Sequence, residues 1–339
     1  MRAFSYRRAH DATEAAHAAA GQGGRSATAA AVQFIAGGTT MLDLMKLDTV
    51  QPQELIDIGD LRSRFDYIRI DDHGLHLGAL TRMQRVAEDP MINRLYPVIA
   101  ETMRLAASPQ IRNMATLAGN VLQRSRCNYF RNTGWAKCNK RDPGSGCSAI
   151  DGVNRKHAVL GVGEHCISAY PGDFAQALVA LDATVEIVAA GGARALRFES
   201  LHLGPERPEL ETALLPGEII TGFVVPAGPW TQRSTYVKVR DRESYEFALA
   251  SAAVALHMQG AHVLAARIGL GGVAYKPWRA HEAEAALIGR TLDETSAQAA
   301  AHAAFGAAVT REGNAFKADL GRRTLVRALL QAQAMDLRS

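Results

Sequence analysis

The four cysteines of this chain crowd into one short stretch of the sequence. All four lie within 40 consecutive positions of a 339-residue chain. Random placement would give such crowding with a chance below roughly one percent, so one shared cause is indicated. A chain of this length does not need disulfide staples for stability. The fold must therefore accommodate a segment devoted to these thiols, which are Cys127, Cys138, Cys147 and Cys166.

The segment that carries the cysteines, residues 124–166, is rich in Gly, Asn, Arg and Lys and is long for a loop in a compact domain. Its spacing, C-x10-C-x8-C-x18-C, lacks the C-x2-4-C pairs that are typical of zinc sites. Two disulfides in one loop would call for a secretory signal. Four thiolates from an irregular loop suit a [4Fe–4S] cluster, but the usual ferredoxin spacing is missing as well. The spacing alone leaves a cluster, a zinc site and disulfides or free thiols open.

The composition excludes several classes of protein. Hydrophobic residues make up 47% and charged residues 21% of the chain, as in packed proteins and unlike disordered or fibrous ones. A net charge of +4 is too small to indicate nucleic-acid binding. The longest stretch without acidic or basic residues, 247–266, is interrupted by polar residues and Gly260, so we expect no transmembrane helix. Arg7-Arg8 precede no apolar segment, and we expect this end to belong to the mature protein.

Hydrophobic patterning predicts an α/β unit, a second unit and a separate C-terminal α+β region. The first sixty residues alternate as strand, helix, strand, turn, helix and strand. A second unit begins near Leu61, and residues 226–230 (PAGPW) are typical of a linker. Beyond the linker, the pattern predicts strands and then two Ala-rich helices. The strands are expected at 236–240, 252–256 and 263–269, and the helices at 292–310 and 322–335.

Two motifs could bind a ligand. Ile35-Ala36-Gly37-Gly38-Thr39-Thr40 joins a predicted strand to a predicted helix, where glycines let backbone N–H groups approach a phosphate. An ordinary strand-to-helix turn is the alternative. The run 108–121 (SPQIRNMATLAGNV) brings hydroxyl and amide groups together, which could bind a polyanion or a ring edge. Its alternative is a buried loop whose polar side chains bond to their own backbone.

These motifs, with two more, carry a resemblance to a known family. AGGTT followed by an apolar helix, then SPQIRNMATLAGNV, PGDFAQALVALDA and LLPGEIITGFVVP, resemble in order and rough spacing the FAD-binding subunit or domain of the xanthine dehydrogenase family of molybdenum hydroxylases. The segment ARIGLGGV, followed by Pro277 and Arg279, is similar to the C-terminal domain of the same flavoproteins. The resemblance covers almost the whole chain.

The resemblance implies an α+β fold. It consists of a two-subdomain FAD-binding domain of the vanillyl-alcohol oxidase-like (PCMH) type and a smaller α+β C-terminal domain like that of carbon monoxide dehydrogenase flavoproteins. The implied boundaries are 1–60 for subdomain 1, 61–228 for subdomain 2 with an iron–sulfur insertion at about 121–170, and 231–337 for the C-terminal domain.

The family pattern also implies a set of FAD-binding residues. Its glycine turn would hold the pyrophosphate, the second motif would form the opposite wall, Asp173 would contact the ribose or adenosine end, and Ile220 and Lys238 would lie near the isoalloxazine. Ala118 departs from the glycine of many members. FAD is expected to be non-covalent because the turn contains no His or Cys. The implied residues are Ile35, Ala36, Gly37, Gly38, Thr39, Thr40, Ser108, Ile111, Asn113, Thr116, Gly119, Asn120, Asp173, Ile220 and Lys238.

Most members of the family lack the cysteine insertion. Those that carry it resemble the FAD and iron–sulfur subunit of three-subunit bacterial aldehyde oxidoreductases, which favours one [4Fe–4S] cluster held by Cys127, Cys138, Cys147 and Cys166. Six cations and one acid between residues 120 and 142 could stabilise an anionic cluster, or form a solvated basic loop or a docking face for an acidic partner. His157 and His165 flank the fourth cysteine, and we expect them to support the ligands or lie at the surface. We expect the FAD and cluster sites to be built from different segments.

The resemblance implies a function in electron transfer. The chain would be the electron-transfer subunit of a molybdenum-containing aldehyde oxidoreductase and would work with a small subunit carrying two [2Fe–2S] clusters and a large molybdenum-cofactor subunit. Electrons would pass from these partners to FAD and then to an external acceptor. Two alternatives are a free-standing flavin oxidase or reductase and a zinc-stapled scaffold subunit without redox activity. A periplasmic location, reached by co-export with a signal-bearing partner, and a cytoplasmic one are both compatible with the sequence.

Overall fold

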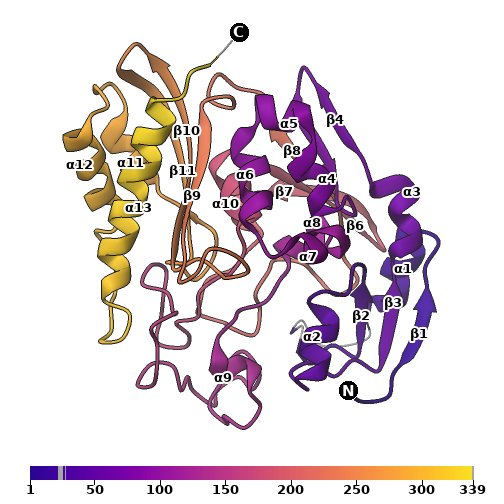
Figure 1. The fold of residues 1–339 in the computed structure, drawn as a ribbon. Coiled ribbons are helices and arrows are strands. Elements are labelled where there is room, and N and C mark those ends of the chain that lie inside the picture. Colours follow the sequence, from indigo (N-terminus) through magenta and orange to yellow (C-terminus); the bar gives the residue numbers. More distant parts are fainter. Residues whose placement is uncertain (22–25, 27, 338–339) are drawn as a thin grey trace.

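The computed structural model of the chain describes residues 1–21, 26 and 28–337, which form three sheets and the helices packed on them (Figure 1). The first sheet is parallel and lies within the first sixty residues, as the alternating pattern predicts. Its middle strand, β3, pairs with β1 and β2. The elements are β1 (Ser5–Arg8), α1 (Ala12–Ala19), β2 (Val32–Ile35), α2 (Met41–Lys46) and β3 (Glu54–Asp57).

The second sheet has five antiparallel strands in the order β4-β5-β8-β6-β7. The core of this unit lies between the sheet and helices α4, α6 and α10, where Phe174 and Phe223 meet edge to face. Its strands are β4 (Ile68–Asp71), β5 (Gly74–Gly78), β6 (Thr184–Ala189), β7 (Gly192–Arg197) and β8 (Ile219–Pro226). Its helices are α3 (Arg62–Phe65), α4 (Met83–Glu88), α5 (Pro90–Leu95), α6 (Pro97–Leu105), α7 (Pro109–Met114), α8 (Leu117–Val121) and α10 (Phe174–Ala180).

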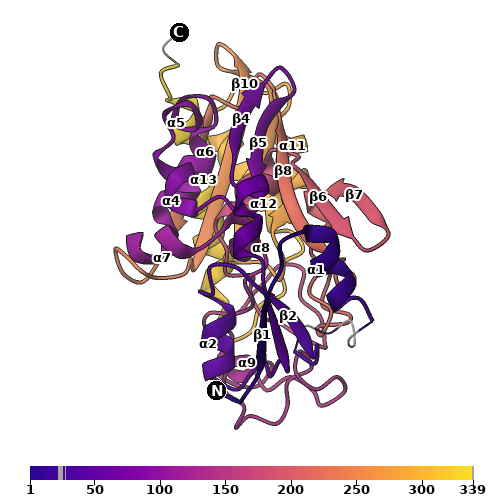
Figure 2. The ribbon, with the colours of Figure 1, turned by 90° about the vertical axis from the view of Figure 1, so that its right-hand side faces the viewer.

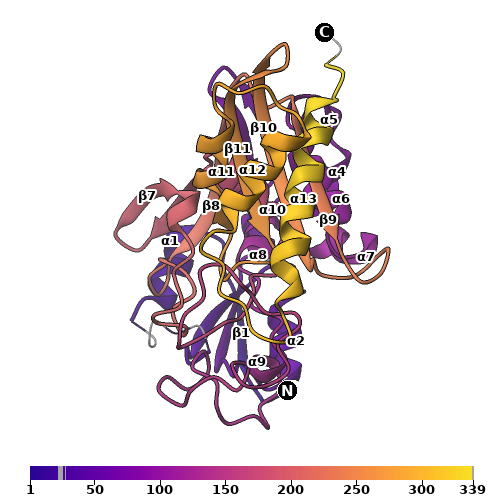
Figure 3. The same ribbon diagram turned by 90° about the vertical axis from the view of Figure 1, so that its left-hand side faces the viewer.

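The third sheet is antiparallel and is buried on both faces, because alternate residues of its strands enter two different cores. On β10, Ala253 and Ala255 face the core of the second unit, whereas Val254 and Leu256 face helices α11–α13. Figure 3 shows these three helices covering the outer face of the sheet. The elements are β9 (Ser234–Val239), β10 (Ala250–Gln259), β11 (His262–Gly271), β12 (Trp278–Arg279), α11 (His281–Leu287), α12 (Glu294–Ala304) and α13 (Phe316–Gln333).

The last two helices differ from their predicted bounds. The first ends at Ala304 and not at residue 310, because the chain turns there and buries the Phe305 ring. The second begins at Phe316, six residues before its predicted start, because Lys317 is buried in its first turn and bonds to backbone carbonyls of other segments. No helix in the described part of the chain is long and apolar enough to cross a membrane.

The cysteine loop, residues 122–173, is irregular as predicted and contains one short helix, α9 (Asn128–Arg131). Figures 1 and 2 show it at one end of the molecule, where α9 lies near α2 of the first unit. Arg126 and Arg131 both pair with Asp43 of α2. Arg141 donates to four carbonyls of its own loop, and Arg124 and Lys140 bind Glu211. Five of the six loop cations therefore hold the loop in place, and the sixth, Lys137, is exposed.

Arg279 joins the C-terminal sheet to the second unit. Its buried guanidinium binds Glu284 of α11, the carbonyl of Val179 at 2.7 Å and Asp182 at 2.8 Å. We predict that Arg279→Ala lowers the free energy of unfolding by about 3–5 kcal/mol, because it leaves Glu284 without its main buried counter-charge and removes one of the three cations that pair with Asp182. Urea unfolding followed by circular dichroism measures the change. Arg323→Ala, at an exposed ion pair, is the control and should change stability by less than about 0.5 kcal/mol; equal effects would contradict the prediction.

Candidate functional site

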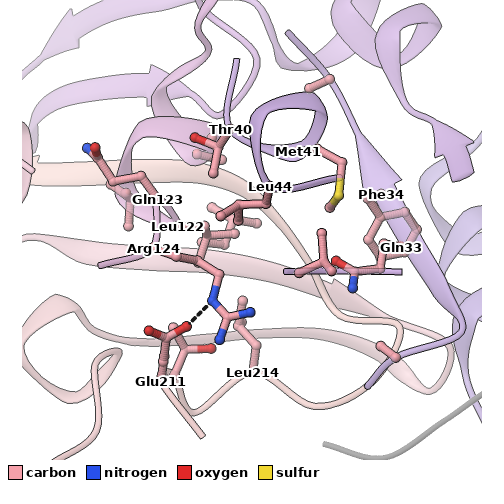
Figure 4. Close-up of a pocket in the computed structure, with 18 of the residues that line it drawn as sticks. Gln33, Phe34, Thr40, Met41, Leu44, Leu122, Gln123, Arg124, Glu211 and Leu214 are labelled. Carbon is pink, nitrogen blue, oxygen red and sulfur yellow. Dashed lines mark hydrogen bonds and ion pairs between the residues drawn. The ribbon is translucent and has the colours of Figure 1, made fainter. Parts of the chain in front are cut away.

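A cavity of about 350 Å³ lies where the first unit, the second unit and the cysteine loop meet (Figure 4). One wall is the end of β2 and the turn that leads into α2. A second wall is the first turn of α8 and the start of the cysteine loop. The remaining walls are formed by residues 168–171, 202–203, 209–220 and 275–276, which come from connections between elements.

The glycine turn after β2 is held very close to the end of α7. Gly38 has a φ of +73°, a left-handed conformation that favours glycine. A side chain on Gly37 would meet the Met114 carbonyl oxygen, which lies only 2.1 Å from where its Cβ would be. Glycine is therefore needed at position 37 to avoid a clash and at position 38 to adopt the left-handed conformation.

The second motif, 108–121, forms two short helices whose caps use its hydroxyl groups. The Ser108 hydroxyl accepts the Ile111 N–H at 3.4 Å, and the Thr116 hydroxyl accepts the Gly119 N–H at 3.3 Å. The self-bonded alternative is therefore confirmed for these two hydroxyls. The side-chain oxygen of Asn120 is buried and has no hydrogen-bond partner among the described residues.

The polar end of the cavity is an ionic cluster around Glu211. Arg124 binds one carboxylate oxygen, and Lys140 binds the other at 2.9 Å and also bonds to the Tyr275 hydroxyl at 3.0 Å. Burial works to raise the pKa of Glu211, but Arg124 and Lys140 outweigh it and lower that pKa to about 2. The carboxylate is therefore ionised at neutral pH.

A buried aromatic pair forms another part of the wall. The rings of Tyr170 and His202 lie 4.9 Å apart, and both side chains reach the Val121 carbonyl. Burial lowers the pKa of His202 to about 4 and raises the pKa of Tyr170. Both groups are thus uncharged at neutral pH, so this part of the wall is polar without being ionic.

The structure brings all six predicted glycine-turn residues to the cavity but only three of the other nine. The residues that line it are Ile35, Ala36, Gly37, Gly38, Thr39, Thr40, Thr116, Gly119 and Ile220. Within the described chain, the predicted residues that lie outside its lining are Ser108, Ile111, Asn113, Asn120, Asp173 and Lys238.

Asp173 and Lys238 form a buried ion pair with each other. The carboxylate accepts from Lys238 Nζ at 2.8 Å and from the Tyr236 hydroxyl at 2.5 Å, and both charged side chains are at most 5% exposed. Lys238 also donates to the Leu105 carbonyl at 3.0 Å. The pair thus joins the start of α10 to β9 and α6, beside the cavity and not in its wall.

Several residues of the cavity lining are not predicted by the sequence motifs. Arg124 and Lys140 are expected only as cations of the cysteine loop, and no motif contains Glu211, Tyr170 or His202. The loop residues Gln123–Ser125, Lys140 and Ser168 also line the cavity. The expectation that this cavity and the cysteine site are built from different segments is therefore wrong, because the cysteine loop forms part of the cavity wall.

The four thiols gather from separate parts of the loop. Cys138 and Cys147 face each other in an isolated antiparallel bridge, and the thiols of Cys147 and Cys166 are hydrogen-bonded. Cys127 interacts electrostatically with Cys166 and Cys138. All four cysteines are free, which excludes disulfides among them in this structure. In the described ranges, no group of three or more His, Cys, Asp or Glu side chains is placed so that it could hold a metal ion.

Burial and neighbouring groups separate the thiols electrostatically. Burial raises the pKa of Cys127 to about 12, whereas a hydrogen bond from Cys147 lowers the pKa of Cys166. His157 lies against the set, with its Nε2 3.2 Å from Cys127 Sγ, and His165 is exposed. The four cysteines therefore form a sulfur-rich group, and His157 contacts one of them, Cys127.

Comparison with known proteins identifies the class of protein that this fold and cavity define. Residues 2–228 match the family described as the FAD binding domain in molybdopterin dehydrogenase, and residues 235–332 match the carbon monoxide dehydrogenase flavoprotein C-terminal domain. The chain belongs to the FAD-binding medium subunits of the molybdenum hydroxylase family, as the sequence motifs predicted, and is an oxidoreductase subunit.

Individual relatives agree with this assignment. The chain is 43% identical, over 98% of its own length and 99% of the relative's, to the aldehyde oxidoreductase FAD-binding subunit PaoB of Escherichia coli K12. It is 28% identical, over 77% of its length and 73% of the relative's, to the carbon monoxide dehydrogenase medium chain of Afipia carboxidovorans. A solved carbon monoxide dehydrogenase from Hydrogenophaga pseudoflava matches 98% of both chains with a TM-score of 0.75 and 25% identity. The predicted fold class is thus confirmed.

We predict that Gly37→Ala lowers the FAD content of the purified chain. The new Cβ cannot remain 2.1 Å from the Met114 carbonyl oxygen, so the glycine turn and the end of α7 must separate. Absorbance at the flavin bands, relative to protein, measures the loss. Gly191→Ala is the control, because nothing lies within 4 Å of its added Cβ; equal flavin content in both variants would remove the turn from the site.

Proposed function

We propose that this chain is the electron-transfer subunit of a molybdenum-containing aldehyde oxidoreductase. It would receive electrons from a large molybdenum-cofactor subunit and a small subunit with two [2Fe–2S] clusters, and deliver them to an external acceptor. The observation that carries the proposal is the gathering of four free thiols in a loop that also lines the cavity of a FAD-binding domain. The similarity to an aldehyde oxidoreductase subunit over almost the whole chain supports the choice of reaction class.

The cavity residues fit FAD. Gly37 and Gly38 line the cavity without side chains, so a diphosphate can approach their backbone, and the apolar side chains Phe34, Leu44 and Ile220 offer surface to a ring system. The buried, unpartnered N–H groups of Arg124 call for an acceptor. Bound FAD would supply the redox chemistry, as a carrier of two electrons. The part played by the chain is to bind and orient the cofactor and to exclude water from it.

The cysteine loop fits a [4Fe–4S] cluster. Cys127, Cys138, Cys147 and Cys166 supply four sulfur ligands, and such a cluster requires little else from the chain. Buried Lys140 acts on Cys166 and favours its thiolate form. Tyr129, packed edge to face on Trp135 at 4.9 Å, bonds to the Val153 N–H and closes one side of the loop. These contacts keep the thiols near one another and shield them from water.

We predict that Cys138→Ser removes iron from the purified chain. The wild type is expected to contain about four iron atoms per chain, and serine is a poor replacement for a thiolate ligand. Iron analysis and the broad visible absorbance that bleaches on reduction are the measurements. Val153→Ser, in the same loop at a side chain 77% exposed, is the matched control and should keep its iron.

The same measurements can overturn the proposal. Zinc without iron in the wild type would show that the loop serves another purpose, and a colourless protein would remove the flavin as well. Unchanged iron in Cys138→Ser would remove this cysteine from the ligands.

A further inference from the structure

Arg124 carries unsatisfied donors in the wall of the cavity. Its side chain is buried, with 8% of the residue exposed, and its Nε donates to Glu211. Nη1 and Nη2 are both buried and have no hydrogen-bond partner among the described residues. Figure 4 shows the guanidinium in the middle of the lining residues, joined to Glu211. A buried, charged N–H group without an acceptor lowers the stability of the protein. We therefore expect a ligand to supply the acceptors that Arg124 lacks.

The charges around Arg124 favour an anionic ligand. Arg124 shares the single carboxylate of Glu211 with Lys140, so this carboxylate does not fully offset the charge of Arg124. The other acids of the wall, Glu209 and Glu218, are paired with Arg207 and Arg194. Apart from Glu211, every acid among the described lining residues is therefore paired with a cation other than Arg124.

Two contacts fix the orientation of the guanidinium before any ligand arrives. Glu211 holds Nε, and the Phe130 ring lies 4.8 Å from the guanidinium carbon. Leu44, Leu122 and Leu214, also drawn in Figure 4, surround it with apolar surface. The two free N–H-bearing nitrogens thus form a rigid fork, the geometry that suits oxygen atoms of a phosphate.

We propose that Arg124 binds the diphosphate of FAD through Nη1 and Nη2. The proposal rests on the proposed function and deepens it, because it places a diphosphate-binding residue in the cysteine loop in addition to the glycine turn. Because Arg124 lies three residues before Cys127, FAD binding and the folding of the cysteine loop become mutually dependent.

FAD titration of the deflavinated full-length chain, followed by flavin fluorescence, tests the proposal. Arg124→Met should raise the dissociation constant for FAD at least about tenfold, equivalent to 1.4 kcal/mol, and Arg124→Lys should raise it less because it keeps the charge. Lys137→Met is the matched control, because Lys137 is an exposed cation of the same loop and is outside the cavity lining; its affinity for FAD should match that of the wild type. ADP, used as a competitor, should lose affinity in parallel with FAD.

A second measurement separates binding from misfolding. Arg124→Met leaves Lys140 paired with Glu211, so the variant without flavin should keep the circular dichroism spectrum of the wild type while its FAD affinity falls. Loss of folded structure in the flavin-free Arg124→Met variant, together with unchanged FAD affinity in Arg124→Lys, would overturn the proposal. A dissociation constant for Arg124→Met within twofold of the wild type would overturn it too. Failure of the wild type to bind FAD would instead overturn the proposed function.

Discussion

The carboxylate of Glu211 is the interaction on which the functional region depends. It lies between Arg124 and Lys140, two buried cations from opposite ends of the first half of the cysteine loop. Without Glu211, these two buried cations would have no carboxylate between them, which would lower the stability of the fold by several kcal/mol. This contact fixes two points of the cysteine loop in the cavity wall.

Much of the fold could be predicted because its signals are local. The hairpin turn at Gln259-Gly260 and the alternation along β10 and β11 mark two strands, and the structure has them as β10 and β11. Asp is a preferred N-cap residue, and Asp11 accepts the N–H groups of Thr13 and Glu14 at the start of α1. The start of α13 was missed because Lys317 is polar in the sequence yet buried in the structure, where three backbone carbonyls replace water.

The candidate site was less predictable because it depends on contacts between distant segments. A glycine turn is visible in the sequence, since strand, glycines and helix follow one another. Glu211 meets Arg124 across 87 positions, and nothing near Glu211 in the sequence marks it. Asp173 and Lys238 were each assigned to FAD by resemblance, whereas the structure pairs them with each other across 65 positions. Complementary charges of this kind can be recognised only after the fold has brought them together.

The cysteine loop and the acids that hold it form one structural unit. Asp43 has ion pairs with Arg126 and Arg131 alone among the described residues, and Glu211 with Arg124 and Lys140 alone. Both acids therefore form ion pairs with the cysteine loop and with no other described segment. A loop inserted without them would place four cations against the protein with no counter-charge, which burial would penalise. Four cysteines are thus only part of what this insertion needs, and a chain that acquires the loop must also carry acids at the α2 surface and before β8.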